Sequence, residues 1–531
     1  MIRKVIKESS RTQNSVLNLT TGIFGQLLLT VLRFVTRTVF ISTLGKTYLG
    51  ISGLFSDILS MLSLTEFGFD LAINYKLYKP LADHDEHRVR ILMKFYKHAY
   101  RVVGSTMLLL GLCLIPFLPI LIRDYDSLSV LKINATLVFL LYLCNSVSSY
   151  FFFAYRSAVL KANQKRYIIE IADSFFTLAM NITQICVLIF LKDFIIYTAI
   201  AIVFTFLKNL INAYISTRLF PQFFIKETDR LEKSEVLGLL KDCGALFVYR
   251  LNEVVLKATD NIVLSSFIGL KSVGLYSNYL IFYTTIKLFL GRLYTAITAS
   301  VGNLFATEKS IEKRYNFFEF MNYVTIIFYG TAAIGIAVCA NEMILVWIGD
   351  QYVLAQPVAI LMGIEILFRG LQVNLSQIRN TSGVFRQMWY RPIISVLINI
   401  IVSVALVRIW GINGVLIGTI SSILLTDFLF DPSLILKYSF KKIKPVSVYY
   451  KKNILYFLIL IAIYYVNNFI CKQFFTGYGW VSIIVHSIIV AITVPSIFII
   501  LFWNTSECKY FVQLIKRIFR KIINKIKNRI S

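Results

Sequence analysis

Apolar stretches of about 17 to 25 residues recur along nearly the whole chain, separated by short polar segments. About 14 of them can be counted, the first covering roughly 14 to 41 and the last roughly 480 to 503. Strand-like alternation is absent and the chain has only nine Pro, so helices rather than a barrel would satisfy the backbone in lipid. We therefore expect an all-α integral membrane protein with about 14 transmembrane helices and no soluble domain.

Composition supports this fold class and decides what the net charge means. The 531 residues are 57% hydrophobic and only 16% charged, which is far more apolar than a soluble domain. The net charge of +27 could indicate a nucleic-acid surface. With a cytosolic N-terminus, however, the segments that face the cytosol, such as 73–101 and 379–391, hold about 40 of the 55 Lys and Arg. We expect a multi-pass protein with both termini cytoplasmic and no nucleic-acid partner.

Four charged residues lie within one predicted span, at spacings of three and four residues: Arg250, Glu253, Lys257 and Asp260. This spacing places them on one face of a helix. Inserting four ionised side chains would cost roughly 10 to 14 kcal/mol if nothing compensated them. Two interpretations stay open, because the four charges can pair along the helix and cancel, or the stripe can line a polar cavity.

Further ionisable residues within the predicted spans point to an anion site. No carboxylate lies three or four residues from Arg33 or Lys287 on their own helices. Cations around a central cavity would select an anion, and phosphate or diphosphate is the group that Lys and Arg commonly bind. The candidate substrate-binding residues are Arg33, Arg250, Lys257 and Lys287. The candidate residues for proton or sodium coupling are Asp57, Glu253, Asp260 and Glu365.

An internal repeat divides the chain into lobes. Gly45 and Gly50 match Gly269 and Gly274 at an offset of 224 residues, and the same offset places Arg33 on Lys257. Both helices run outward, which predicts parallel repeats about an axis normal to the membrane. We expect an N-terminal lobe (1–218), a cytosolic linker (219–241), a C-terminal lobe (242–436), two further spans (437–503) and a basic amphipathic cytosolic tail (504–531). The tail would lie on the anionic inner leaflet or bind a partner helix.

Motifs for catalysis or cofactor binding are missing from the sequence. It contains no GxxxxGK[ST] loop, no GxSxG elbow and no HExxH. The segment 83–87 offers Asp, Glu and His ligands, but no second cluster follows in the sequence, and the seven cysteines show no CxxC pairing. We expect no enzyme activity, no cofactor and no metal site, so that an ion gradient or the substrate gradient would drive any transport.

Several short motifs extend along most of the chain. They are Leu44-Gly45, Tyr48-Leu49-Gly50, Gly53-Leu54-Phe55, Ile58-Leu59, Leu62-Ser63-Leu64, Glu66, Gly68, 76–82, 259–262, 273–279, 299–304, Trp347-Ile348-Gly349 and 437–440. Together these motifs resemble those of the Wzx-like polysaccharide transport branch of the multidrug, oligosaccharidyl-lipid and polysaccharide exporter (MOP) superfamily.

This resemblance implies a MATE/MurJ-like fold, with two parallel six-helix lobes around a central cavity and two further C-terminal helices. It also implies a flippase that moves a polyprenyl-diphosphate-linked oligosaccharide across the bacterial plasma membrane by alternating access. It would serve capsule, exopolysaccharide or other surface-glycan export, with membrane lipids and other polysaccharide assembly proteins as partners. The family's cationic cavity maps onto Arg33, Arg250 and Lys257, with Lys287 near it, although the position of Lys257 is more often uncharged in that family. Three alternatives remain: a peptidoglycan-precursor (lipid II) flippase, a multidrug exporter of the same superfamily, and a membrane glycan polymerase or ligase.

Overall fold

The computed structural model describes residues 11–530 except 64–68, 124, 127, 129–132, 164, 309, 382–389 and 475–478. Within some helices only the backbone is described. Throughout this described part the regular structure is helical and no strand is present, as the sequence predicts. The chain divides into two compact units, unit 1 (Met1–Gly274) and unit 2 (Leu275–Ser531).

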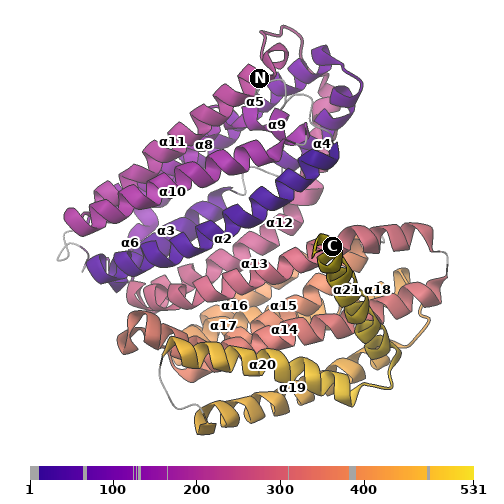
Figure 1. Ribbon diagram of the computed structural model, residues 1–531. Helices are drawn as coiled ribbons and strands as arrows, with labels where there is room; N and C mark the ends of the chain where they lie inside the picture. The colour runs from indigo at the N-terminus through magenta and orange to yellow at the C-terminus, as the bar shows by residue number, and fades with distance from the viewer. Residues whose placement is uncertain are drawn as a thin grey trace. The chain divides into compact units, whose positions relative to one another are not determined.

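Unit 1 is a bundle of long helices with short connections (Figure 1). The predicted first span, roughly 14 to 41, corresponds to the helix α2, which runs from Arg11 to Leu44. The other helices of the unit are α3 (Lys46–Leu62), α4 (Phe69–Ala82), α5 (Glu86–Leu114), α6 (Leu118–Leu121), α8 (Ala135–Phe151), α9 (Ser157–Ala162), α10 (Arg166–Phe190), α11 (Phe194–Leu219) and α12 (Lys233–Phe267). Asp85, Asn134 and Asp193 accept backbone N–H bonds at the starts of α5, α8 and α11, which satisfies otherwise unpaired helix donors.

Unit 2 contains a second set of long helices. They are the main part of α13 (Leu270–Thr307), then α14 (Ile311–Ile348), α15 (Gln356–Thr381), α16 (Arg391–Trp410), α17 (Ile412–Ile423), the π-helical segment η7 (Leu424–Phe428), α18 (Asp431–Tyr438), α19 (Val446–Phe474), α20 (Trp480–Leu501) and α21 (Ser506–Ile530). The helix α14 is the core of this unit, with 72% of its most apolar window buried. The amphipathic tail forms α21, whose Phe511 is buried and whose Tyr510 meets Phe320 of α14 edge to face.

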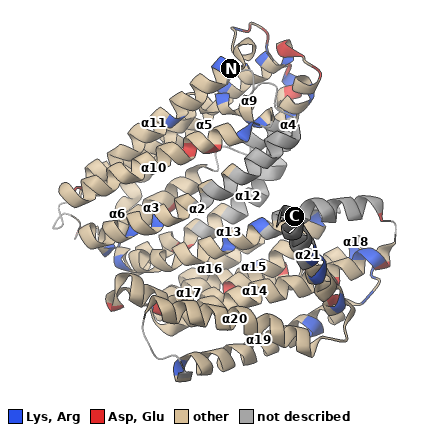
Figure 2. Ribbon diagram, in the orientation of Figure 1, with Lys and Arg blue, Asp and Glu red and all other residues tan. Residues whose placement is uncertain are grey.

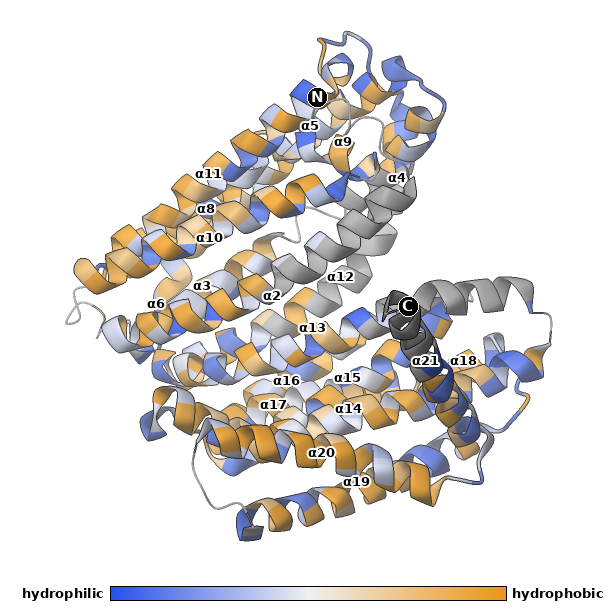
Figure 3. Cartoon of the chain, in the orientation of Figure 1, coloured by the Kyte–Doolittle hydropathy of each residue, from blue (hydrophilic) through white to orange (hydrophobic). Residues whose placement is uncertain are grey.

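Hydropathy supports a membrane location. Nine helices of the described part are long and apolar enough to cross a bilayer, and a tenth is added if the bent pair Ala135–Phe151 and Ala154–Ala162 is one span. Figure 3 shows hydrophobic residues along the helices, and Figure 2 shows that Lys, Arg, Asp and Glu gather toward helix ends and connections. The chain is a multi-pass membrane protein.

The two glycine motifs of the repeat have the same backbone geometry and pack against each other within unit 1. Gly45 and Gly269 both have positive φ, 83° and 116°, just before α3 and α13 begin. A Cβ on Gly50 would lie 2.1 Å from the carbonyl oxygen of Leu270, and a Cβ on Gly274 would lie 2.3 Å from that of Lys46. Because Lys46 and Leu270 are themselves related by the offset of 224, this contact is reciprocal. Glycine is required at both positions so that the backbones can approach.

Candidate functional site

The predicted substrate-binding cations fall in different parts of the structure. Arg250 and Lys257 lie on α12, but their side chains are outside the described residues, as is that of Glu253. Lys287 lies on α13 in unit 2, where its side chain is partly exposed. Arg33 lies on α2 and lines a pocket within unit 1. Of the four predicted cations, Arg33 is therefore the one whose side chain can be described as part of a cavity wall.

Arg33 lies deep along its helix. It precedes the end of α2 at Leu44 by 11 residues, or about 16 Å at 1.5 Å per residue. Since the hydrocarbon core of a bilayer is about 30 Å thick, this depth is close to the middle of a span. In the part of the chain that the structure describes, Arg33 forms no hydrogen bond or ion pair. A guanidinium at this depth is costly unless water, another protein group or a ligand compensates it.

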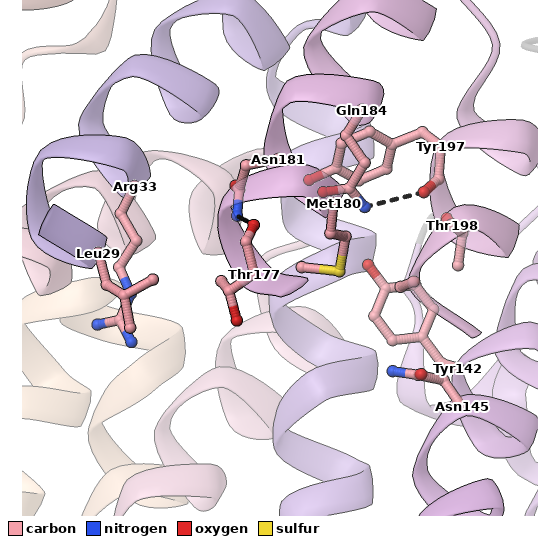
Figure 4. Close-up of a pocket in the computed structure, with 11 residues that line it drawn as sticks. Leu29, Arg33, Tyr142, Asn145, Thr177, Met180, Asn181, Gln184, Tyr197 and Thr198 are labelled. Atoms are coloured by element: carbon pink, nitrogen blue, oxygen red, sulfur yellow. Dashed lines mark hydrogen bonds between the residues drawn. The ribbon is translucent and has the colours of Figure 1, made fainter. Parts of the chain in front are cut away.

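The pocket at Arg33 has a volume of about 300 Å³ and is formed by α2, α8, α10 and α11 (Figure 4). Polar side chains from three of these helices complete its wall. Its lining consists of Leu29, Arg33, Tyr142, Asn145, Thr177, Met180, Asn181, Gln184, Tyr197, Thr198 and Ala201. No carboxylate is among these described lining residues, so the pocket is cationic and rich in hydrogen-bond donors.

Hydrogen bonds hold the amide side chains of this wall in place. Thr36 donates to Asn181 Oδ1 at 2.8 Å, and Asn181 Nδ2 donates to the carbonyl of Thr177 at 2.7 Å. Gln184 Nε2 donates to the carbonyl of Tyr197 at 3.0 Å (Figure 4). Packing and supporting hydrogen bonds of this kind keep a binding surface preorganised. The sequence did not indicate these amides, because single Asn and Gln residues within apolar helices carry no spacing signal.

Two of the predicted coupling carboxylates are buried in unit 1. Asp57 of α3 is 7% exposed and accepts a hydrogen bond from Asn261 Nδ2 of α12. Asp260, also 7% exposed, lies next to Asn261 on the same helix. Asp57 therefore lies where α3 and α12 pack. Neither carboxylate lines the pocket of Arg33.

In unit 2 the fourth predicted coupling residue, Glu365, is part of a buried polar network. Tyr283 donates to Glu365 Oε1 at 2.9 Å, and Arg369 Nε lies 3.3 Å from the same oxygen. Arg369 Nη1 reaches Gln372 at 3.3 Å, and Gln372 Nε2 donates to Asp427 at 3.0 Å. Hydrogen bonds and an ion pair thus connect Tyr283 of α13, through Glu365, Arg369 and Gln372 of α15, to Asp427 of η7.

The network continues into a second group of charges. Asp427 pairs with Arg391, whose Nη1 also lies 3.4 Å from Asp431 Oδ2. Arg379 Nη1 donates to the same Asp431 oxygen at 2.8 Å, and no side chain of this group is more than 6% exposed. We call Glu365, Arg369, Asp427, Arg391, Asp431 and Arg379 the charge chain. Its three cations balance its three carboxylates, which is the condition for burying ions without a large penalty.

The position of Asp427 in a π-helical segment is typical of functional sites. The segment η7 interrupts the span Ile412–Tyr438, and π-bulges occur frequently where side chains must be redirected. The sequence pattern places Arg379 and Arg391 in a cytosolic segment because they flank a polar loop. The structure buries both against Asp431, a residue that the pattern did not single out.

A smaller cluster lies at the α5 end of unit 1. His87 Nδ1 lies 3.1 Å from Glu227 and His87 Nε2 lies 3.1 Å from Asp229. Arg90 donates to Glu227 at 3.0 Å, and this hydrogen bond is the main cause that lowers the pKa of Glu227 to about 2. In the sequence, no second group of metal-type ligands accompanied the segment 83–87. The fold brings such a group, Glu227 and Asp229 of the linker, next to His87. Because Arg90 already occupies the shared oxygen, the cluster is best described as an ion-pair contact.

Comparisons with solved structures identify the fold. Neither a protein-family model nor a curated protein matches the sequence. The lipid II flippase MurJ in an inward closed conformation superimposes with a TM-score of 0.66 at 15% identity, covering 91% of this chain and 99% of that one. An inward-facing multidrug resistance MATE family transporter of the MOP superfamily gives a TM-score of 0.61 at 12% identity, covering 78% and 96%. An outward-facing transporter of the same description gives 0.53 at 13% identity, covering 83% and 99%.

At these identities the likeness concerns the fold alone. It agrees with the MATE/MurJ-like architecture that the sequence predicts. The chain thus has the all-helical membrane fold that MATE family transporters of the MOP superfamily share with the lipid II flippase MurJ.

Proposed function

We propose that the protein is a flippase that moves a polyprenyl-diphosphate-linked oligosaccharide across a bacterial plasma membrane by alternating access, for the export of a surface glycan. The observation that carries this proposal is the pocket of unit 1, where Arg33 lies at mid-span depth and no described carboxylate faces it. A diphosphate offers the oxygens that a guanidinium binds in a fork geometry. A carrier of organic cations would instead need carboxylates in such a pocket.

An apolar groove in unit 2 supports a substrate with a long lipid chain. It has a volume of about 300 Å³ and lies among α14, α15 and α19. Its wall includes Ile334, Leu367, Phe368 and Leu460. Gly363 lets α15 pack closely on α14, since a Cβ there would lie 2.5 Å from the carbonyl oxygen of Ala333. A branched isoprenoid chain fits an apolar surface of this kind, and the groove lies on helices that are long and apolar enough to span the membrane.

The extent of the structural similarity also supports a lipid-linked substrate. MurJ covers 91% of this chain, whereas the inward-facing MATE transporter covers 78%. The difference is roughly 70 residues, which is about the length of two spans with their connection. MurJ is a flippase of lipid II. The resemblance of the sequence motifs to polysaccharide flippases favours an oligosaccharide over lipid II for this chain.

We assign the roles accordingly. Arg33 would bind the diphosphate, and Arg250, Lys257 and Lys287 are the other candidates for this role. Glu365 is the best supported of the four coupling candidates, because it is buried and shared by Arg369 and Tyr283. Its protonation would release Arg369 and so change how α15 is held by the charge chain.

The function is tested by complementation in a bacterial strain that lacks its own oligosaccharide flippase. The wild-type protein should restore surface polysaccharide. Arg33→Ala should reduce the amount of surface polysaccharide by about 10- to 100-fold, because the variant loses one charge-assisted hydrogen bond worth about 1.5 to 3 kcal/mol. Arg33→Lys should restore part of it. Arg101→Ala is the matched control, since Arg101 is exposed on α5 and does not line the pocket.

Mass spectrometry of lipids carried through gentle purification identifies the substrate. A bound polyprenyl diphosphate with several sugars supports the proposal. A bound peptidoglycan precursor would reassign the protein as a lipid II flippase. Drug efflux without a lipid-linked glycan would make it a multidrug exporter, and new glycosidic bonds formed by the purified protein would make it an enzyme. Normal polysaccharide with Arg33→Ala at normal expression would contradict the role of Arg33.

A further inference from the structure

A second cationic pocket lies at one end of unit 1, where three membrane helices begin or end. The span that contains α5 begins at Glu86, α8 ends at Phe151 and α11 ends at Leu219. The pocket has a volume of about 580 Å³ and is closed on one side by the linker that follows α11. Its lining consists of Arg90, Met93, Lys94, Lys97, His98, Tyr155, Arg156, Phe223, Phe224, Ile225, Lys226, Glu227 and Thr228. Because it lies at the ends of spans, it is at the depth of lipid headgroups.

Charge is concentrated in this pocket. Five Lys and Arg side chains line it with a single carboxylate, that of Glu227. Glu227 is already bound by Arg90, which donates to it at 3.0 Å. The remaining cations therefore lack a matching number of protein anions in the lining. Figure 2 shows Lys and Arg residues at this end of unit 1, near α9, together with acidic residues in the connection from α4 to α5.

Three of the cations are fixed by contacts that shape the pocket. Lys94 donates to the backbone carbonyls of Thr228 at 2.8 Å and Asp229 at 3.2 Å, which holds the linker across α5. Arg156 donates to Thr217 at 2.7 Å, and its guanidinium lies 5.2 Å from the centre of the Phe224 ring. Arg90 is held by Glu227. The walls are thus positioned independently of any ligand.

Two cations remain for a ligand. Neither Lys97 nor Lys226 forms a hydrogen bond or an ion pair with any residue that the structure describes, although both line the pocket. The side chain of Lys97 is partly buried and that of Lys226 is exposed. An ammonium group without a protein partner beside three fixed cations is a site for an anion, and a phosphate supplies several acceptor oxygens.

Apolar residues at the rim indicate that this phosphate belongs to a lipid. Ile225 lines the pocket and is 62% exposed. Phe153, 37% exposed, lies beside the pocket residue Arg156, whose guanidinium is 5.1 Å from the centre of its ring, and the preceding residue Phe152 is 42% exposed. Aromatic side chains at a membrane interface typically contact the region where headgroups meet acyl chains. A soluble phosphate compound would gain nothing from these exposed rings, whereas the upper acyl chain of a phospholipid would cover them.

We propose that this pocket binds the phosphate of an anionic phospholipid headgroup, with Lys97 and Lys226 as its direct ligands. With the predicted topology, the lipid belongs to the cytosolic leaflet, which is the leaflet that basic juxtamembrane clusters recognise. The lipid joins α5, the α8–α9 connection and the linker, and so stabilises unit 1. This site is separate from the pocket of Arg33 and does not depend on the transported substrate.

The full-length protein in zwitterionic nanodiscs provides the test, with phosphatidylglycerol added in increasing proportion. Thermal unfolding of the wild type should shift upward with phosphatidylglycerol, and native mass spectrometry should retain bound phosphatidylglycerol. The double variant Lys97→Gln/Lys226→Gln should bind phosphatidylglycerol about 30-fold more weakly than the wild type, because each lysine contributes about a factor of five to the affinity. Lys451→Gln is the control, because this exposed lysine lies on the same predicted side but on α19.

Three results would overturn the proposal: no dependence of unfolding on phosphatidylglycerol, an equal shift in the double variant, or equal protection of the wild type by soluble inorganic pyrophosphate. The last result would reassign the pocket to a soluble phosphate compound. If the double variant proves unstable, the single variant Lys226→Gln replaces it in the test, because this variant changes one exposed side chain and should preserve the fold. In zwitterionic nanodiscs, all variants should unfold at the temperature of the wild type.

Discussion

Replacing Gly50 by Ala tests the close approach of the two repeat motifs. The new Cβ would lie 2.1 Å from the carbonyl oxygen of Leu270, so the backbone of α13 must move away from α3. Overpacking of this kind costs about 1 to 3 kcal/mol. Alanine in place of glycine inside a helix recovers only about 0.5 to 1 kcal/mol. We expect Gly50→Ala to lower the stability of the protein by up to about 2.5 kcal/mol, the overpacking cost less the helix gain.

A glycine on the same helix provides the matched control. In Gly53→Ala the nearest atom would be Val273 Cγ1 at 3.5 Å, an ordinary van der Waals distance. This variant should therefore be as stable as the wild type or slightly more stable, by up to about 1 kcal/mol. Both proteins are compared by thermal unfolding in detergent, followed by tryptophan fluorescence. Equal midpoints for Gly50→Ala and Gly53→Ala would refute the close approach.

The reciprocal position extends the test to the repeat itself. A Cβ on Gly274 would lie 2.3 Å from the carbonyl of Lys46, so Gly274→Ala should be destabilising by a similar amount. Since both substitutions separate the same pair of helix starts, the double variant should lose less stability than the two single variants together. Strict additivity would show that the two glycines act at independent sites.

The remaining predictions concern the charged groups. Asp431→Ala leaves buried guanidinium groups uncompensated and should lower the free energy of unfolding by about 3 to 5 kcal/mol, which would appear as a lower yield or a lower unfolding midpoint. The control is Asp173→Asn, which removes a partly exposed ion pair with an N–O distance of 3.9 Å and should lower the free energy of unfolding by less than about 1 kcal/mol. Glu365→Gln should leave the protein folded but make transport into vesicles insensitive to an imposed proton gradient, and unchanged sensitivity would exclude this carboxylate from coupling. Arg90 lowers the pKa of Glu227 from 4.5 to about 2, so the contact of the linker with α5 should be fully present above about pH 4.5 and lost as the pH falls toward 2. Glu227→Gln should expose the linker to proteolysis at pH 7, and equal cleavage of variant and wild type would show that the ion pair does not hold it.

Much of the fold can be predicted from the sequence because bilayer insertion depends on local composition. The run of apolar residues that predicts the last span, roughly 480 to 503, corresponds to α20 (Trp480–Leu501). The glycine motifs were also visible in the sequence, since the offset of 224 aligns both pairs. The lobe boundaries and the roles of Arg250, Lys257 and Glu253 remain predictions.

The candidate site was predictable only where a charge interrupts an apolar run. Arg33 and Glu365 stand out in this way, and the structure places both in polar surroundings. The amides around Arg33 carry no such signal, because a single Asn or Gln in a span does not reveal which helix it faces. Arg379 looked like an ordinary cytosolic cation until packing brought it to Asp431.

By itself, the sequence determined that this is an all-helical membrane protein, that its Lys and Arg are concentrated in alternate connecting segments, and that a cation lies deep in its first predicted span. These properties depend on hydropathy and charge along the chain, because each segment inserts into the bilayer according to its own composition. Only the tertiary structure decided which charges meet. It paired Arg391 with Asp427 and Asp431, and it gathered lysines from α5 and the linker into one pocket. Such contacts join residues far apart in the chain, and their free energy depends on a helix packing that no local pattern encodes.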